Sequence, residues 1–367
     1  MGGGPDKTIL LSAARHNPNR VSVVVAYVRN AQDREFTIAE KAYALGLTFY
    51  QIEEHSKFDP RVLRAIRDIV IEHDINLIHA HDYKSDLFAY LTRYLLWRRH
   101  LGLFATAHGW ALLGARGEVY RRLDLFLLRR FDHVLTVSHA TRDGLISSGI
   151  APASVSVLHN GIDTEAWSPP GEHAILAGNP LPRSHFPVVG YVGRITPEKD
   201  LQTWLHSAAL VVQQFPDARF VLVGDGKDEG LLRELQHLAE TLGIAKQVAF
   251  PGYQESPQAF YGNFDLFLLT SVTEGLSNSL LEAMAMGLPT VVTRVGGNEE
   301  LVVDGHTGYI LPAGDVQGIA QAIITLARNE QLRRNMGQAG RRRIEHEFSF
   351  AQRLQRIESL YEQLIGA

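Results

Sequence analysis

The chain contains no cysteine among its 367 residues, which excludes disulfides, thiolate metal sites and a cysteine nucleophile. No apolar run approaches the ~20 residues of a membrane-spanning helix, and residues 1–15 lack the basic and apolar regions of a signal peptide. The formal net charge of −4 argues against a general nucleic-acid binder, which is usually basic. We therefore expect a cytoplasmic protein with no nucleic-acid partner.

The composition that remains is that of an α/β protein, and its length exceeds the size at which one core usually keeps growing. Short apolar runs alternate with helical patterns, which is the βαβ signature of a parallel sheet. The expected strands form two series: 21–27, 48–52, 77–80, 103–107, 133–137 and 155–158, then 188–192, 219–223, 248–250, 265–269, 290–293 and 308–310. Proline and glycine between 168 and 183 indicate a linker. We expect domains at 1–168 and 184–348, and a tail at 349–367 with apolar residues at helical spacing from 350 to 364.

Two carboxylates, Glu274 and Glu282, stand eight positions apart where an expected strand leads through a loop into a helix over 279–286. In a parallel sheet, the carboxyl end of a strand lies at the ligand crevice, and the free amides after Gly275 would present a helix N-terminus to an anion. Carboxylates repel an anion, so they must serve hydroxyls. A ligand with a phosphate and several hydroxyls, a nucleotide sugar, satisfies both requirements.

This segment resembles the retaining glycosyltransferases of family 4 when it is taken with other motifs in their order along the chain. These motifs are Thr106-Ala107-His108-Gly109, Val137-Ser138, Asn160-Gly161-Ile162-Asp163, Gly193-Arg194 with Lys199, Phe250-Pro251-Gly252-Tyr253, Gly296-Gly297-Asn298-Glu299-Glu300 and Asp304-Gly305-His306-Thr307-Gly308-Tyr309. The resemblance covers most of the chain. It implies the α/β GT-B fold, two Rossmann-like domains facing each other across a cleft, with a tail helix that crosses back to the first domain.

The resemblance also implies roles for individual residues. Arg194 and Lys199 would hold the diphosphate of the leaving nucleotide, Glu282 would accept hydrogen bonds from the ribose, and Glu274 would contact the donor sugar. His108 would contact the transferred sugar near its reacting carbon. The expected catalytic residues are His108, Glu274, Arg194 and Lys199. The expected donor-binding residues are Gly193, Arg194, Lys199, Gly224, Tyr253, Glu274, Gly275, Leu276, Ser277, Asn278 and Glu282. On the acceptor side we expect Gly3, Gly4, His81, Lys84 and His108.

Each assignment has a simpler alternative. Arg194 with Lys199, and Glu282, can be solvated surface charges, and His108 can be a structural histidine. Tyr253, where the family reads the base edge through backbone groups, is nearly as well explained as a core or turn tyrosine. The glycines from Gly224 to Gly230 are spaced one residue too widely for a dinucleotide fingerprint, and we interpret them as a turn that lines the nucleotide pocket.

We expect neither a metal nor a cofactor. His79 and His81 alternate on one expected strand, but no third ligand at suitable spacing accompanies them. Arg194, Lys199 and the helix amides can replace a metal at the diphosphate. The resemblance implies a retaining reaction by same-face attack, in which the leaving phosphate helps to take the acceptor proton.

The start of the chain departs from the family pattern. Family members begin with a hydrophobic strand and a glycine-rich loop, whereas here Gly2-Gly3-Gly4-Pro5 and a helical pattern over 6–15 follow Met1 directly. The missing strand would lie in the middle of the sheet, so its neighbours would be left with unpaired ladders. Either the native start is elsewhere or the first domain is compromised.

Arginines gather in the first domain among apolar residues, at 93, 98, 99, 121, 122, 129 and 130. Such a mixture is typical of a surface that lies against anionic lipid headgroups. It is equally typical of an amphipathic surface whose long side chains cover the core. If the first interpretation holds, the protein works at the inner face of a membrane.

The sequence therefore predicts transfer of a sugar from a nucleotide diphosphate sugar to a glycan or lipid-linked acceptor, in cell-surface or exopolysaccharide synthesis. Two alternatives remain. One is another enzyme on the same fold, a sugar-nucleotide epimerase or a glycogen-type phosphorylase, which the Glu274 to Glu282 segment disfavours. The other is a nucleotide-sugar-binding protein that has lost transferase activity.

Overall fold

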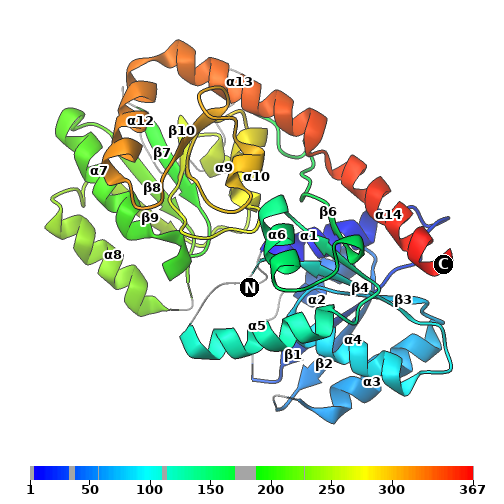
Figure 1. Ribbon diagram of the computed structural model, residues 1–367. Helices are drawn as coiled ribbons and strands as arrows, with labels where there is room; N and C mark the ends of the chain where they lie inside the picture. The colour runs from blue at the N-terminus through cyan, green and yellow to red at the C-terminus, as the bar shows by residue number, and fades with distance from the viewer. Residues whose placement is uncertain are drawn as a thin grey trace. The chain divides into compact units, whose positions relative to one another are not determined.

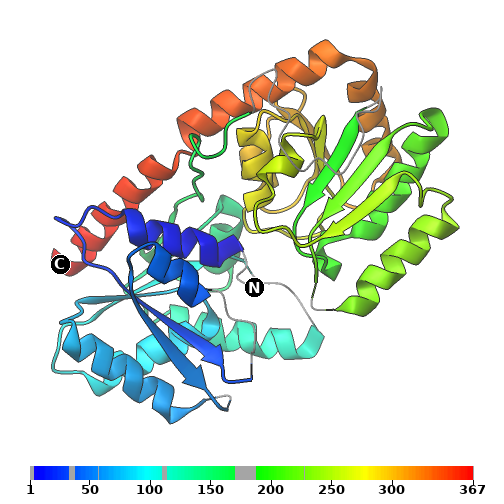
Figure 2. The ribbon, with the colours of Figure 1, turned by 180° about the vertical axis from the view of Figure 1, so that it is seen from behind.

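A computed structural model describes residues 4–32, 38–56, 58–109, 114–169, 187–226 and 228–366. The chain divides into two compact units, shown in Figures 1 and 2. The first unit comprises residues 1–160 and 351–367, and the second comprises residues 161–350. Each unit combines parallel β-strands with helices.

The strands of the first unit form two separate parallel sheets. They are β1 (Val24–Asn30), β2 (Thr48–Glu54), β3 (Leu77–Ala80), β4 (Gly102–Ala107), β5 (His133–Thr136) and β6 (Val155–Val157). One sheet pairs β1 with β2, and the other has the order β3-β4-β5-β6. Within the described residues, β1 and β3 therefore each have a strand partner on one side only. The sequence predicts that the neighbours of a missing central strand are left unpaired on one side. Here these neighbours are β1 and β3.

Seven α-helices accompany these strands in the described part of the first unit. They are α1 (Gly4–Arg15), α2 (Ile38–Ala44), α3 (Pro60–Glu72), α4 (Tyr83–Leu95), α5 (Gly114–Leu128), α6 (His139–Ser147) and α14 (Phe350–Gly366), with a short 3-10 turn η1 (Pro152–Ser154). Local sequence sets several starts. Asp59 caps α3, whose first residue is proline, and Asp82 forms a reciprocal capping box with Ser85 at α4.

The tail helix α14 is fixed to the start of the chain. Arg20 forms ion pairs with Glu358 at 2.8 Å and with Glu362 at 2.6 Å. Arg353 is almost fully buried and donates to Ser12 of α1 at 3.1 Å. Figure 2 shows α1 beside α14. The helical pattern predicted over 350–364 is confirmed and extends to 366.

The second unit contains one continuous sheet of six parallel strands in the order β12-β11-β10-β7-β8-β9. These strands are β7 (Val188–Val192), β8 (Arg219–Val223), β9 (Val248–Gly252), β10 (Leu266–Leu269), β11 (Thr290–Thr293) and β12 (Gly308–Leu311). Its helices are α7 (Leu201–Gln214), α8 (Glu229–Thr241), α9 (Gln258–Tyr261), α10 (Asn278–Ala285), α11 (Asn298–Leu301), α12 (Val316–Arg328) and α13 (Glu330–Glu347), with the 3-10 turn η2 (Pro197–Lys199). All five residues of the central strand β7 are buried.

The predicted strands are confirmed in type and order, and most bounds agree within two residues. The exception is the first strand, predicted over 21–27 and found at 24–30. A turn in which the backbone N–H groups of Arg20 and Val21 donate to the carbonyl of Asn17 occupies the preceding residues. The predicted linker lies mostly outside the described residues.

Candidate functional site

The segment from β10 to α10 forms the strand, loop and helix that the sequence predicts. The four residues of β10 are buried, and the chain then turns through 270–277 into α10. The Ser277 side chain caps the helix by accepting from the Leu280 N–H at 3.3 Å. The first amides of a helix have no partner inside it, so this end of α10 favours negative charge.

Glu274 lies in that loop and is held by two side chains. Its Oε1 atom is 2.5 Å from Lys199 Nζ and accepts from Ser271 Oγ at 2.6 Å. The Lys199 and Glu274 side chains are only 13% and 9% exposed. The structure therefore brings together two predicted site residues that stand 75 positions apart.

The loop after β7 is tied to the loop after β10 by its backbone. Thr270 Oγ1 donates to the Lys199 carbonyl at 3.0 Å, and the Val272 N–H donates to the Glu198 carbonyl at 2.9 Å. These bonds fix the place of Lys199 relative to Glu274. Since β7 and β10 are neighbours in the sheet, both loops leave its carboxyl edge together.

Arg194 lies in the same loop with a largely exposed side chain. Its Nη2 atom is 3.7 Å from Glu198 Oε1, and its carbonyl accepts from the buried Tyr191 hydroxyl at 2.9 Å. Burial, followed by the nearby Glu274 charge, raises the pKa of Tyr191, so this hydroxyl stays a donor. The guanidinium group thus remains available to a ligand while its backbone is fixed.

Gly193 and Gly224 let the loops after β7 and β8 approach each other. Gly224 has φ of +141°, and a Cβ atom there would lie 1.8 Å from the Gly193 carbonyl oxygen. Its N–H donates to the Gly252 carbonyl at 2.9 Å, next to Tyr253, whose side chain is exposed. Only glycine fits this turn, because a side chain would separate the two loops.

Glu282 is a partly buried helix residue with a specific partner. The Tyr261 hydroxyl lies 2.9 Å from Glu282 Oε2 and 3.1 Å from the Ser279 carbonyl. Burial and the Glu282 charge raise the pKa of Tyr261. The carboxylate is therefore oriented by the fold, which a freely solvated helix residue would not be. Leu276 is buried, and Gly275 accepts from the Gly297 N–H at 2.9 Å.

Three histidines lie near one another in the first unit, at and beyond the ends of β3 and β4. His81 Nδ1 is 3.4 Å from His108 Nε2, and their rings stack with centroids 5.6 Å apart. Both ring nitrogens of His79 are engaged, one with the Tyr361 hydroxyl at 2.6 Å and the other with Thr106 Oγ1 at 2.7 Å. His79 is thus a structural histidine rather than half of a metal pair.

The histidines are kept neutral by their surroundings. Burial, followed by the positive charge of Arg353, lowers the pKa of His108 to about 4. Burial and the neighbouring histidine and arginine charges lower the pKa values of His79 and His81 well below 6.5. A neutral imidazole can both donate and accept a hydrogen bond.

The remaining acceptor-side predictions concern Lys84, Gly4 and Gly3. Lys84 forms an ion pair with the buried Glu54 at the end of β2, so its charge is already balanced. Gly4 is the first residue of α1. Gly3 lies outside the described residues. None of these placements tests the proposed acceptor role.

Sequence reasoning missed the supporting residues Tyr191, Ser271, Tyr261 and Arg353. Ser271 carried a weak signal, because it follows the buried strand three residues before Glu274. The tyrosines carried none, since only the fold directs the Tyr191 hydroxyl to the loop after β7 and the Tyr261 hydroxyl to α10.

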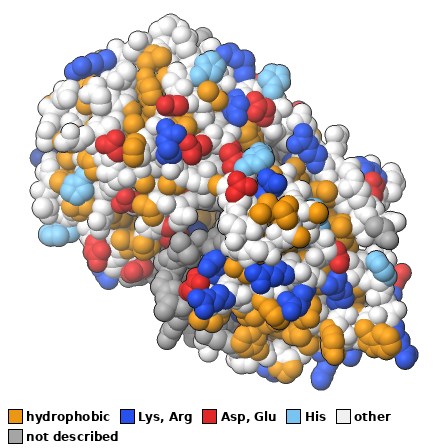
Figure 3. Space-filling view, viewed as in Figure 1, with side chains coloured by type: hydrophobic (Ala, Val, Ile, Leu, Met, Phe, Trp, Pro, Cys, Tyr) orange, Lys and Arg blue, Asp and Glu red, His pale blue; other side chains and the backbone are white. Residues whose placement is uncertain are grey.

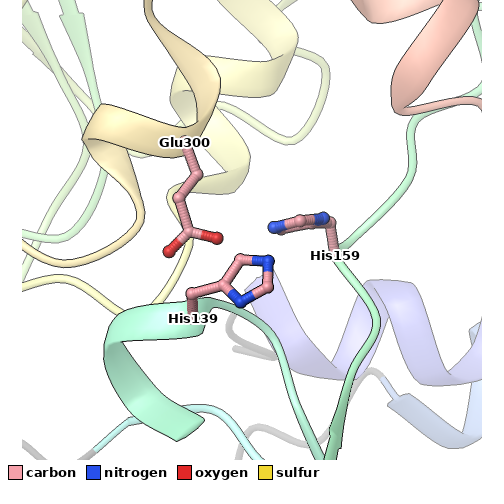
Figure 4. Close-up of side chains that lie close together, drawn as sticks. All are labelled: His139, His159 and Glu300. Carbon is pink, nitrogen blue, oxygen red and sulfur yellow. The ribbon is translucent and has the colours of Figure 1, made fainter. Parts of the chain in front are cut away.

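His139 and His159 are a further histidine pair of the first unit, with ring centroids 5.8 Å apart (Figure 4). The third side chain drawn there, Glu300, belongs to the second unit. Two histidines from one unit supply fewer ligands than a zinc site holds, so we assign no metal to the pair.

Comparisons with known proteins agree with this geometry. Residues 179–343 match the family model described as "Glycosyl transferases group 1", and residues 7–166 match "Glycosyltransferase Family 4". A capsular polysaccharide biosynthesis glycosyltransferase, CapM of Staphylococcus aureus, is 29% identical over 62% of this chain and 60% of its own length. The UDP-Gal:alpha-D-GlcNAc-diphosphoundecaprenol alpha-1,3-galactosyltransferase of Escherichia coli is 24% identical over 84% of this chain and 80% of its own.

Among solved structures, Anabaena Alr3699/HepE in complex with UDP and glucose superposes with a TM-score of 0.85 at 20% identity, over 99% of this chain and 96% of that chain. This likeness confirms the predicted fold class, an α/β protein of the GT-B type with parallel sheets.

Proposed function

Because the chain belongs to the family 4 glycosyltransferases, the glycosyl transferases group 1, we propose that it transfers a hexose from a nucleotide diphosphate sugar to a glycan or lipid-linked acceptor, with retained anomeric configuration. Support for the acceptor class comes from the Escherichia coli relative, named for a diphosphoundecaprenol-linked acceptor. The capsular relative supports a role in cell-surface or exopolysaccharide synthesis. A lipid-linked acceptor resides in a membrane, so we also propose a peripheral membrane contact.

The observation that carries the proposal is the group formed by Lys199, Glu274 and Ser271 beside the N-terminus of α10. Lys199 is held in place by its ion pair with Glu274, and we propose that it attracts the diphosphate together with Arg194 and the helix amides. Among the described residues, the ionic contact of Arg194 is the long one to Glu198, and its guanidinium group can form two parallel hydrogen bonds to phosphate oxygens. Glu274 and Glu282 then accept hydrogen bonds from sugar hydroxyls.

In the proposed step, an acceptor oxygen attacks the anomeric carbon from the face at which the diphosphate leaves. The bond between that carbon and the phosphate oxygen breaks as the new glycosidic bond forms, and the acceptor proton passes to a phosphate oxygen. Arg194, Lys199 and the amides stabilise the charge that grows on the diphosphate. His108 is neutral near pH 7 and supplies a hydrogen bond to the transferred sugar.

Substitution of Lys199 tests the donor site. Lys199→Ala should weaken binding of a nucleoside diphosphate about 10- to 150-fold, because a charged contact contributes ~1.5 to 3 kcal/mol. Binding of the nucleoside alone should change little. Calorimetry with both ligands measures the difference, and Lys246→Ala, at an exposed lysine of the same unit, is the matched control. Equal losses for both ligands would remove Lys199 from the site.

Substitutions of Glu274 and His108 test the sugar contacts. Glu274→Gln and His108→Ala should lower turnover strongly while nucleotide affinity stays nearly unchanged. A variant with normal turnover would refute the role of that residue. Wild-type protein that binds donor without hydrolysis or transfer would instead support a binding protein. Thermal-shift screening with UDP-, GDP- and ADP-sugars identifies the donor.

A further inference from the structure

The helix α5 carries an exposed stripe of alternating apolar and cationic side chains. Val119, Arg122 and Phe126 follow one another at intervals of three or four residues, which places them on one face of the helix, and Arg129 comes directly after its last residue. Val119 is 66% exposed and Phe126 is 48% exposed. Leu125, Leu127 and Leu128 of the same helix are buried and pack in the core, whereas Val119 and Phe126 remain exposed to solvent.

The end of α4 extends this stripe. Tyr94, Leu95 and Trp97 are exposed, and Trp97 reaches 72% exposure. Arg93 joins the two helices by donating to Asp132 at 2.8 Å and to the Arg130 carbonyl at 2.5 Å, just beyond α5. In the chain order β3-α4-β4-α5-β5, right-handed crossovers place both helices on the same face of the sheet.

The charge of this surface differs in sign from that of the whole chain. Residues 93–109 and 117–132 contain seven arginines and three acidic residues, whereas the chain has a formal net charge of −4. Arg98 lies over the Trp97 ring at 4.9 Å, and Arg130 lies over the Phe126 ring at 3.5 Å. Below the surface, burial and Asp124 raise the pKa of Asp86, which reduces the negative charge there.

We propose that the exposed face of α4 and α5, defined by Tyr94, Trp97, Val119, Arg122, Phe126 and Arg129, docks on a bilayer that contains anionic lipid. Figure 3 shows Lys and Arg side chains beside hydrophobic ones over this part of the first unit. Trp and Tyr fit the headgroup level of a membrane, where one end of the ring is apolar and the other is wet. Arg122 pairs with Glu118 and Arg129 donates to the Ser148 carbonyl, and both guanidinium groups keep further N–H donors for lipid phosphates.

The charge and the aromatic residues together favour a lipid surface over other partners. A nucleic acid would use the cations but leave Val119 and Leu95 in water, whereas a second copy of this chain would bring the same positive charge against itself. The inference deepens the proposed function by naming a surface for its membrane partner, and it rests on that function only for the position of the acceptor.

The test is co-sedimentation of the full chain with vesicles. Wild-type protein should bind vesicles of 70% phosphatidylcholine and 30% phosphatidylglycerol more tightly than pure phosphatidylcholine, and 0.5 M salt should weaken the binding. Arg122→Glu with Arg129→Glu should lower the affinity for anionic vesicles at least tenfold. Trp97→Ser should lower it severalfold on both vesicle types, because it removes an apolar contact.

Matched controls separate the patch from general effects. Tyr43→Ser changes an exposed aromatic residue of α2, and Arg334→Glu changes an exposed arginine of α13, so both should bind as wild type. Circular dichroism checks that each variant is folded. Release of nucleotide from a donor, measured without vesicles, should be unchanged in all of them, so failure to bind lipid is distinguishable from failure of the transferase.

The fluorescence of Trp97 also reports directly on contact with lipid. Brominated lipid should quench its fluorescence, and Trp97→Phe should retain vesicle binding while losing most of that quenching. The proposal is overturned if wild type ignores vesicle charge, if the patch variants bind as tightly as wild type, or if Trp97→Ser instead abolishes self-association in sedimentation.

Discussion

The two units have similar strand series, but their sheets are built differently at one position. In the second unit, β7 comes first in sequence and lies between β8 and β10, so the sheet is continuous. In the first unit, β1 and β2 correspond to β8 and β9, and β3 follows as β10 does. Within the described residues, no strand lies between β1 and β3.

The strands that border this position also differ in how deeply their side chains are buried. All of β8 after Arg219 is buried, whereas β1 has one buried residue and an exposed Ala26 at its third position. The His79 side chain of β3 is surrounded by polar and aromatic groups rather than by a neighbouring apolar strand. A central strand thus does more than pair its neighbours: it completes the apolar faces on both sides.

The largest expected effect comes from placing one charge in each sheet. Val221→Asp, at the third residue of β8, should destabilise the second unit by about 4 kcal/mol or more, because it buries an unpaired carboxylate. Ala26→Asp, at the third residue of β1, should cost less than about 1 kcal/mol. Urea unfolding measures both, with Val221→Ser and Ala26→Ser as milder pairs. A similar loss of unfolding free energy at both positions would mean that another segment of the chain buries β1.

Acid should affect the first unit more than the second. The folded pKa of His108, about 4, lies below the 6.5 of the unfolded chain, so its stabilising effect is complete above pH 6.5 and is lost as pH falls toward 4. At pH 5 this histidine alone accounts for up to about 2 kcal/mol. Hydrogen exchange at pH 7 and pH 5, corrected for intrinsic rates, should show a selective loss of protection in β3 and β4.

The second unit provides the reference for this experiment. The pKa values of its Tyr191 and Tyr261 are raised, and these shifts matter only in alkali. His237→Gln, at an exposed histidine, should leave the pH dependence unchanged. Equal acid sensitivity in both units would show that the histidine group is not responsible.

A strand added ahead of Met1 should pair with β1 and β3 and make the two units more alike. Fusion of Arg-Phe-Val-Leu-Val, copied from β8, ahead of Met1 should slow amide exchange in β1 and β3 at least tenfold, equivalent to about 1.4 kcal/mol. It should also raise thermal stability and transfer activity, with little change in donor binding. The same peptide with a central proline is the control, because proline cannot complete a ladder. Unchanged exchange, or equal protection in both units of the starting chain, would show that another segment fills the position.

The smallest expected effect comes from removing one hydroxyl group, that of Tyr261 in the second unit. Tyr261→Phe should cost about 1 to 2 kcal/mol, because it removes a buried donor to Glu282 and the Ser279 carbonyl. Thermal unfolding measures the loss. The matched change Tyr253→Phe, at an exposed tyrosine, should have almost no effect. A neutral Tyr261→Phe would mean that water replaces the hydroxyl.

Sequence predicted the elements well where the local pattern determines them. The strand bounds 77–80, 188–192, 219–223 and 290–293 are exact, because each is a compact run bounded by polar residues, glycine or proline. The start of β1 was misplaced, since Val21 continues the apolar run but belongs to a turn.

The pairing of Lys199 with Glu274 was implied only as a shared site, because it depends on β7 and β10 being neighbours. The partners of Tyr191 and Arg353 depend on the fold in the same way and had no local signal. The functional roles themselves stay predictions.

The contact between the loops after β10 and β11 has a consequence for engineering the proposed donor site. Gly296 has φ of +50°, and a Cβ atom there would lie 1.8 Å from the Glu274 carbonyl oxygen, while the next N–H donates to Gly275. Residues 274–276 therefore cannot be remodelled independently of 295–297. A mutant library that replaces Gly296 will mostly sample misfolded proteins, whereas one that varies both loops together and keeps this glycine retains the framework on which new specificities can be selected.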